Sequence, residues 1–466
     1  MLFNSYEFIF LFLPITFFIY FYLTGKKIID GSKAFLVLSS LFFYSWWNVA
    51  YLPIILVSML FNYNIAIQLG KNRDLIVSKK LLLIFSIVMN LLLLGYFKYT
   101  DFLIENINLI SDKNIPILGL ALPLAISFFT FQQISYLVDS YKKETKEYNY
   151  LNYALFVTFF PQLIAGPIVH HKEMMPQFSS NVNLVKNYKN IVLGLFIFSI
   201  GLFKKVVIAD TFATWATNGF DIAMTLNFVE AWATSLSYTF QLYFDFSGYT
   251  DMAIGVALLF NIKLPINFNS PYKATNIQDF WRRWHITLSR FLKEYIYIPL
   301  GGNRKGEIRT YTNLVSTFII GGLWHGAGWT FLFWGLLHGV ALTLHKGWSQ
   351  IGFKLWNWVS WFITFNFINV AWVFFRAKEW TDALKVLNGM LDFNSIEYTF
   401  LAIKGSNWTL LSLVSALIIV LFFKNSITYV SRIEIKRRHA LFFGFIFYYA
   451  LISMINVKSE FLYFNF

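Results

Sequence analysis

Two histidines, His325 and His338, lie in a run of glycine, aromatic and aliphatic residues, GGLWHGAGWTFLFWGLLHG (residues 321–339). An imidazole can give or take a proton near neutral pH, so histidine suits acid–base chemistry there. Ionisable groups at membrane depth are costly and usually mark functional sites. If the chain is a membrane protein, this stretch indicates an intramembrane reaction centre.

The composition is that of a membrane protein. Of the 466 residues, 57% are hydrophobic and only 13% are charged, and the mean hydropathy is +0.55. The absence of cysteine excludes disulfides, thiolate nucleophiles and cysteine-bound metals. The formal charge of +14 is typical of basic cytoplasmic loops. We therefore predict membrane lipids as partners and no nucleic acid.

Apolar runs between polar breaks predict an all-α polytopic protein with about eleven or twelve true spans, the shorter runs being re-entrant or broken. The first run lacks a preceding basic region and a following cleavage site, so we interpret it as a retained span and not a signal peptide. The predicted helices cover residues 6–23, 34–48, 51–69, 80–97, 115–138, 151–169, 190–208, 228–246, 247–262, 311–331, 331–347, 355–375, 406–423 and 439–456.

Basic residues in alternate short loops set the orientation. They follow the first, third and fifth predicted spans, whereas the loop with Asp101, Glu105 and Asp112 is poorer in cations. We therefore place the N-terminus outside and the basic loops in the cytoplasm. The basic residues are Lys26, Lys27, Lys33, Lys71, Arg73, Lys79, Lys80, Lys142, Lys143 and Lys146.

Residues 272–309 form a basic segment. The spacing predicts one helix from Asp279 to about Ile298, capped by Asn276, with His285 on its tryptophan-bearing face. An interfacial helix on anionic headgroups would explain the arginines. It would not explain a histidine on the apolar face. The other interpretation is a polar cavity with a cationic mouth.

A cavity of that kind suits acyl-coenzyme A, an anionic thioester made in the cytoplasm. Two neighbouring elements could bring His285 and His325 together. One can act as a general base on an acceptor hydroxyl, while the other orients the donor or stabilises the oxyanion. The residues predicted to bind the donor or line its passage are Trp281, Arg282, Arg283, Trp284, Arg290, Asn303, Arg304, Trp324 and His338.

Further polar residues interrupt other apolar runs. In residues 238–251 these are Gln241, Asp245, Ser247 and Asp251. Because a carboxylate facing lipid would cost several kcal/mol, we predict that both aspartates are buried or face a cavity. Two roles stay open: hydrogen bonding at a helix break at Gly248, and lining a passage.

Three other histidines have two interpretations each. His170 and His171 follow the broken run FVTFFPQLIAGPIVHH (156–171). They could anchor the headgroup region, which we favour, or serve substrate entry. In one uninterrupted helix, His338 would lie opposite His325. A packing role and a tunnel-lining role are both open for His338.

Long ordered motifs make the chain resemble the membrane-bound O-acyltransferase family, in the branch that O-acetylates bacterial polysaccharides such as alginate and peptidoglycan. The central motifs are residues 280–304, FWRRWHITLSRFLKEYIYIPLGGNR, and the 321–339 stretch. Similar motifs span nearly the whole chain. They occupy residues 1–21, 123–141, 159–168, 241–255 and 461–466.

The resemblance implies one membrane domain, residues 1–466, with a catalytic core at about 115–346 and helices around a funnel or tunnel. It implies that His325 is the catalytic histidine, acting as a base, and that His285 is its partner. It also implies acetyl-CoA as donor, with no resident cofactor or metal. The expected location is the bacterial inner membrane, with an SGNH-type extracytoplasmic acetyltransferase as partner and an exported polysaccharide as final acceptor.

Three other functions remain open. D-alanyl transfer to teichoic acid from a carrier protein would use similar chemistry, and the basic mouth would suit its phosphopantetheine arm. A glycan or lipid transporter could use the intramembrane aspartates, but the sequence lacks repeated halves with matching broken helices. A scaffold for a partner enzyme would leave the two histidine motifs without a purpose.

Overall fold

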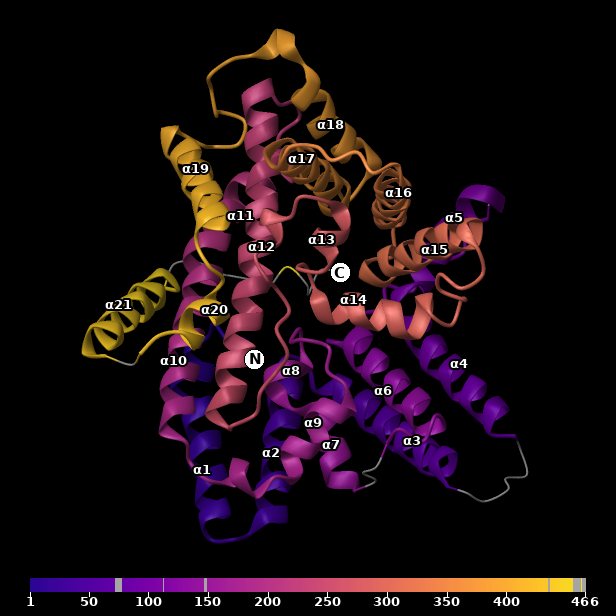
Figure 1. The fold of residues 1–466 in the computed structure, drawn as a ribbon, viewed down its shortest axis with the longest axis vertical. Helices are drawn as coiled ribbons and strands as arrows, with labels where there is room; N and C mark the ends of the chain where they lie inside the picture. The colour runs from indigo at the N-terminus through magenta and orange to yellow at the C-terminus, as the bar shows by residue number, and fades with distance from the viewer. Residues whose placement is uncertain (72–77, 112, 146–148, 435, 456–461, 463–466) are drawn as a thin grey trace. The chain divides into compact units, whose positions relative to one another are not determined.

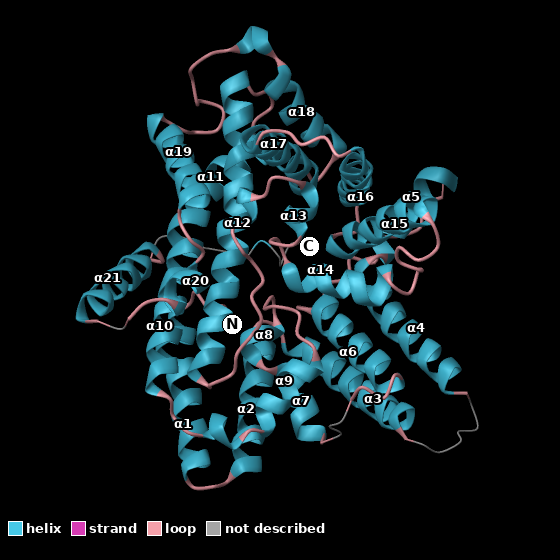
Figure 2. Ribbon diagram, in the orientation of Figure 1, coloured by secondary structure: helices cyan, strands magenta, loops and turns pink. Residues whose placement is uncertain are grey.

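The computed structural model describes residues 1–71, 78–111, 113–145, 149–434, 436–455 and 462. This part of the chain consists of helices and loops, without a strand (Figure 2), so the all-α prediction is confirmed. Arg73, Asp112 and Lys146, which entered the orientation argument, lie outside the described residues. The same holds for the 461–466 motif except Leu462.

The chain divides into two compact units. Unit 1 contains Met1–Phe198 and Thr250–Pro265, and unit 2 contains Ser199–Tyr249 and Ile266–Phe466. The boundary falls inside α10 (Tyr188–Phe203) and α12 (Phe228–Leu259). The single membrane domain and the 115–346 core stay predictions.

In unit 1, α3 (Leu52–Gly70) and α4 (Lys79–Lys98) pack on α6 (Ile126–Tyr141) around a buried amide network. Asn62 donates to Asn90 Oδ1 at 3.0 Å and to Gln133 Oε1 at 2.7 Å. Such bonds satisfy polar groups that lipid could not. Figure 1 labels the α-helices of this unit. Its other elements are η1 (Phe8–Phe12), α1 (Leu13–Gly25), α2 (Ile29–Ser45), η2 (Val49–Tyr51), α5 (Thr100–Ser111), α7 (Tyr150–Thr158), α8 (Phe160–Leu163), α9 (His171–Ser179) and η3 (Asn181–Leu184).

Unit 2 holds the basic segment and the 321–339 stretch. Three of its helical segments, η4, η5 and η7, are π-helical, a wider winding often found at functional sites. Its elements besides α10 and α12 are η4 (Lys204–Ala209), α11 (Asp210–Thr217), η5 (Asn218–Ile222), η6 (Pro271–Lys273), α13 (Ile277–Trp281), α14 (Ile286–Leu292), η7 (Lys293–Tyr297), α15 (Glu307–His325), α16 (Trp329–Ile351), α17 (Asn357–Arg376), α18 (Trp380–Leu391), η8 (Phe393–Ser395), α19 (Asn407–Phe422), α20 (Ser426–Ser431) and α21 (Arg437–Ser453).

Among the described residues, five helical stretches are long and apolar enough to cross a membrane. The chain is therefore a multi-pass membrane protein, and the number of spans predicted from the sequence stays a prediction. The five stretches are Phe8–Gly25, Val49–Gly70, Lys79–Lys98, Tyr188–Ile222 and Asn357–Arg376.

Two predicted helices, 228–246 and 247–262, are in fact the single helix α12. The expected break at Gly248 is therefore wrong. A Cβ at this position would lie 2.8 Å from the carbonyl oxygen of Gly201. Gly248 serves close helix packing and does not end the helix.

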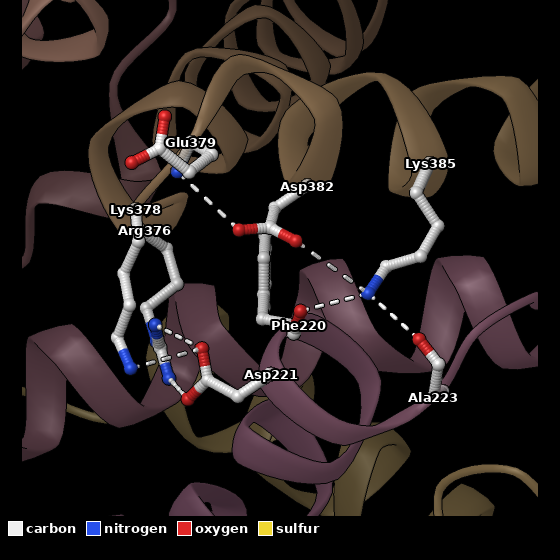
Figure 3. Close-up of polar contacts among 8 residues, drawn as sticks. All are labelled: Phe220, Asp221, Ala223, Arg376, Lys378, Glu379, Asp382 and Lys385. Carbon is white, nitrogen blue, oxygen red and sulfur yellow. Dashed lines mark hydrogen bonds and ion pairs between the residues drawn. The ribbon is translucent and has the colours of Figure 1, made fainter.

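Polar contacts fasten α18 to the π-helical segment η5 within unit 2 (Figure 3). Arg376 Nη1, at the end of α17, donates to Asp221 Oδ1 at 3.1 Å. Lys385 Nζ donates to the carbonyl oxygens of Phe220 and Ala223, each at 2.8 Å. A helix end leaves such carbonyls without partners in the helix, so Lys385 caps η5.

Candidate functional site

The 321–339 stretch contains the end of α15 and the first part of α16, and these two helices lie against each other. α15 ends at His325, and extended backbone at Gly326 and Gly328 leads into α16. A Cβ on Gly322 would lie 2.3 Å from the carbonyl oxygen of Phe331. Glycine there therefore allows the two helices to touch.

His285 lies at a bend between α13 and α14. Its backbone is left-handed, with φ 42° and ψ 54°, so the predicted single helix from Asp279 to Ile298 is wrong. A left-handed residue ends regular α-helix geometry, and a histidine in it is uncommon. The cap at Asn276 is confirmed, since its Oδ1 accepts from the Asp279 N–H at 2.7 Å.

The bend brings His285 next to His325. Their ring centroids are 6.5 Å apart, and the two residues are 0% and 4% exposed. His285 lies outside the candidate spans. Burial lowers its pKa to about 3, so the ring is neutral at pH 7. The neutral His285 and the buried His325 can exchange protons with a substrate between them.

Aromatic rings surround the pair. Phe246 of α12 lies 4.8 Å from His285, and Trp334 of α16 lies 5.2 Å from His325, between centroids. Phe375 of α17 lies 5.1 Å from His325. Trp324, a predicted donor-site residue, is 4.8 Å from His325. Aromatic rings around the two histidines exclude water and so strengthen polar interactions between the groups that they enclose.

Asn267 is part of this arrangement, although sequence reasoning missed it. Its Oδ1 lies 3.2 Å from His285 Nδ1 and accepts from the Thr287 N–H at 3.1 Å. Asn267 is 0% exposed. An isolated asparagine in a loop gives no periodic signal that could have singled it out. We call His285, His325 and Asn267 the histidine site.

His338 lies four residues after Trp334 on α16. Its Nδ1 accepts from Trp281 Nε1 at 3.2 Å, and Trp334 lies 4.8 Å from it between centroids. His338 is 0% exposed, and Trp281 is 6% exposed. These contacts join α13 to α16, which favours the packing role over the tunnel-lining role.

The remaining predicted donor residues are spread over the basic segment. Arg283 Nε donates to both carboxylate oxygens of Asp279 at 2.9 Å. Trp284 is buried against Phe268, 5.0 Å away between centroids. Arg290 is half-buried, and three residues are exposed: Arg282, Asn303 and Arg304. Their role toward a donor stays a prediction.

The chain matches the model of the membrane-bound O-acyltransferase family over residues 35–378. It belongs to this family. The chain is also 57% identical over 438 residues to the peptidoglycan O-acetyltransferase of Helicobacter pylori, which covers 88% of this chain and 83% of the relative. This protein is accordingly an acyltransferase.

Two other relatives extend the comparison. The probable alginate O-acetylase AlgI of Pseudomonas aeruginosa is 39% identical over 401 residues, 85% of this chain and 76% of the relative. The teichoic acid D-alanyltransferase of Streptococcus thermophilus is 27% identical over 289 residues, 54% of this chain and 68% of the relative.

The acyltransferase carries a second buried polar group in unit 2, which we call the charge cluster: Lys205, Asp210 and Asp245. Lys205 Nζ lies 2.6 Å from Asp245 Oδ1 and 2.8 Å from Asp210 Oδ1. Lys205 and Asp245 are each 1% exposed. Sequence reasoning selected Asp245 but missed Lys205, whose flanking apolar run gave no hint of a partner.

The other polar residues predicted on α12 are divided between the two units. Gln241 and Ser247 are buried in unit 2, 7% and 2% exposed, whereas Asp251 is 5% exposed in unit 1. Both aspartates are thus buried, as predicted. A passage lined by these residues stays a prediction.

His170 and His171 are buried in unit 1, at 8% and 4% exposure, so the headgroup-anchor interpretation is wrong. His171 Nδ1 lies 3.2 Å from Asp139 Oδ2. Its ring packs on Tyr136, 5.7 Å away between centroids. A carboxylate partner explains how a histidine can be buried in this acyltransferase.

No group of three or more histidine, aspartate or glutamate side chains that could hold a metal ion occurs in the described part of the acyltransferase. An apolar cavity of about 530 Å³ lies in unit 1 along α3 and α4, where Ile54, Phe61 and Leu93 line it. None of the predicted catalytic or donor residues lines this cavity.

Proposed function

We propose that this chain is a membrane-bound O-acetyltransferase that moves an acetyl group from cytoplasmic acetyl-CoA across the membrane, for O-acetylation of an exported cell-envelope polysaccharide. The observation that carries the proposal is the 6.5 Å separation of the buried His285 and His325 rings, in a member of an acyltransferase family. The names of the relatives support the acetyl group and the polysaccharide class.

The proposed transfer needs one base and one supporting group. The oxygen of an acceptor hydroxyl attacks the thioester carbonyl, a C–O bond forms, the C–S bond breaks, and coenzyme A leaves as a thiolate. His325 takes the hydroxyl proton and gives it to the leaving sulfur. His285 supports the step by orienting the donor or by stabilising the oxyanion.

In this proposal, positively charged side chains bind the phosphates of the donor, acetyl-CoA. Arg282 and Arg304 are exposed on the basic segment, and guanidinium groups bind phosphates through paired hydrogen bonds. With the predicted orientation, this segment faces the cytoplasm of a bacterium, where acetyl-CoA is made. The acetyl group then passes to an SGNH-type extracytoplasmic partner, which acetylates the polysaccharide.

The test is a transfer assay with purified protein in lipid nanodiscs and [¹⁴C]acetyl-CoA. We expect release of coenzyme A and transfer of label to a hydroxyl acceptor or to water. Arg304→Gln should raise the KM for acetyl-CoA with little change in kcat, because it acts on donor capture. Lys113→Gln, a change of an exposed cation in unit 1, is the matched control. Absence of any wild-type turnover of acetyl-CoA would contradict the proposal.

D-alanyl transfer is a second possibility, favoured by the similarity to a teichoic acid D-alanyltransferase. The same nanodiscs would be given a D-alanyl thioester on a carrier protein. Faster turnover of that donor than of acetyl-CoA would replace the acetyl assignment with this one.

A further inference from the structure

The amide of Asn267 has a defined orientation. Its side chain faces the backbone N–H of Thr287 at 3.1 Å and the Thr287 hydroxyl at 2.9 Å. A backbone N–H can only donate, so the atom that faces it must be the amide oxygen. Rotating the amide by half a turn would place an NH₂ donor against an N–H donor.

The same oxygen selects the tautomer of His285. Asn267 Oδ1 lies 3.2 Å from His285 Nδ1, and an amide oxygen only accepts. Nδ1 must therefore carry the hydrogen. A neutral imidazole has one N–H and one acceptor nitrogen, and the buried His285 ring is neutral at pH 7. The lone pair is consequently on Nε2.

We propose that Asn267 is a positioning residue that holds His285 as its Nδ1–H tautomer, which makes His285 a proton-accepting partner of His325 and not an oxyanion donor. This inference rests on the proposed function: it excludes the oxyanion role left open there and gives His285 the role of an acceptor beside His325. An acceptor nitrogen cannot stabilise a developing oxyanion, since that requires a donor. It can accept a hydrogen bond or a proton beside His325.

Asn267 also holds the backbone of the bend. Its carbonyl oxygen accepts from the Ile286 N–H at 3.0 Å, and its side chain accepts from the next N–H. These are the first donors of α14, which have no partner within the helix. A useful measurement must therefore read the tautomer of His285 directly, apart from this capping.

Three variants are compared by that measurement. Asn267→Ala removes the acceptor from both the helix end and the ring. Asn267→Asp keeps an acceptor for both, but places a negative charge beside the ring. Thr287→Val removes one hydrogen bond to the same oxygen without touching His285, and serves as the matched control.

The direct measurement is ¹⁵N NMR of protein labelled at its seven histidines, with His285 assigned by the signals lost in His285→Gln. The wild type, Thr287→Val and Asn267→Asp should show a protonated Nδ1 and an unprotonated Nε2 for His285. Asn267→Ala should lose this preference. A wild-type His285 protonated on Nε2 would overturn the inference, whether or not the protein turns over acetyl-CoA.

Kinetics give an independent readout. Asn267→Ala should lower kcat about 10²-fold, at the lower end of the effects of losing proton transfer, with little change in KM. Thr287→Val should stay within about threefold of the wild type. If Asn267→Ala keeps both the Nδ1–H tautomer and the wild-type kcat, Asn267 is not a positioning residue. A wild type that is inactive with acetyl-CoA counts against the proposed function alone.

The pH–activity profile of Asn267→Asp gives a further test, because the inference predicts the direction in which it shifts. The titratable ring next to His285 is His325, and the other rings in contact are Phe246, Phe268 and Trp324. A carboxylate at position 267 favours the protonated imidazole and raises the pKa of His285. Activity should then fall as the pH drops through that raised pKa, at a pH where the wild type is unaffected. An unchanged acid limb would contradict the inference.

Discussion

The histidine site and the charge cluster are both buried in unit 2, yet they handle polarity in opposite ways. In the charge cluster, Lys205 meets two carboxylates within 3 Å. In the histidine site, His285 bonds to a neutral amide and lies among aromatic rings. The charge cluster pairs its carboxylates with a cation of its own, whereas the histidine site keeps a neutral His285 ring beside His325, where a substrate can exchange protons.

This difference shows how to read ionisable residues in a membrane sequence. Such residues are functional candidates by default, and both Asp245 and His325 qualified. What separates a structural from a functional residue here is whether a buried partner of opposite charge lies next to it. Because Lys205 satisfies Asp245, the charge cluster joins η4 and α11 to α12, while the histidine site keeps the features of a reaction centre.

The largest effect is expected from His325→Gln, which removes the base but keeps a polar side chain of similar length. Acetyl transfer should fall by about 10²- to 10⁴-fold, the usual contribution of a general base. The midpoint of thermal unfolding should change little. Transfer at the wild-type rate would remove His325 from the mechanism and abolish the contrast with the charge cluster.

Lys205→Met should act on stability instead. It leaves two buried carboxylates without their cation, and breaking a buried ion pair destabilises by roughly 3–5 kcal/mol. Activity per folded molecule should stay near the wild type, measured by transfer assays beside thermal unfolding. Lys204→Met is the control, since Lys204 is half-buried and donates to Ser426 Oγ at 3.2 Å. A stable Lys205→Met protein with lost activity would make the charge cluster functional.

Trp281→Phe should have the smallest effect. It removes the hydrogen bond to His338 Nδ1, which is worth about 1 kcal/mol, and keeps the ring packing. We expect a slightly lower unfolding midpoint and a transfer rate within about threefold of the wild type. A loss as large as that of His325→Gln would place His338 in the chemistry and not in packing.

Local signals in the sequence predicted part of this arrangement well. The apolar runs gave the all-α membrane class, Asn276 gave a correct helix cap, and the two histidine motifs gave the pair that the fold brings together. These features depend on residues near one another in the chain. The family motifs carried the same information.

Features that depend on distant contacts could not be predicted. The bend at His285 is held by Asn267, and Lys205 meets Asp245 forty residues further along the chain. Helical periodicity carried α13 straight into α14, because no glycine or proline marks the left-handed residue between them. In the same way, Gly248 looked like a helix break, although the close approach of Gly201 makes it a packing residue.

The most direct test of the central claim compares His285→Gln, His325→Gln and the double variant in one assay of acetyl transfer from acetyl-CoA. Residues that act as a unit on one step have strongly non-additive effects. We predict that the double variant is about as slow as the slower single variant. Losses that multiply in the double variant would show that the two histidines act independently, and would contradict the account.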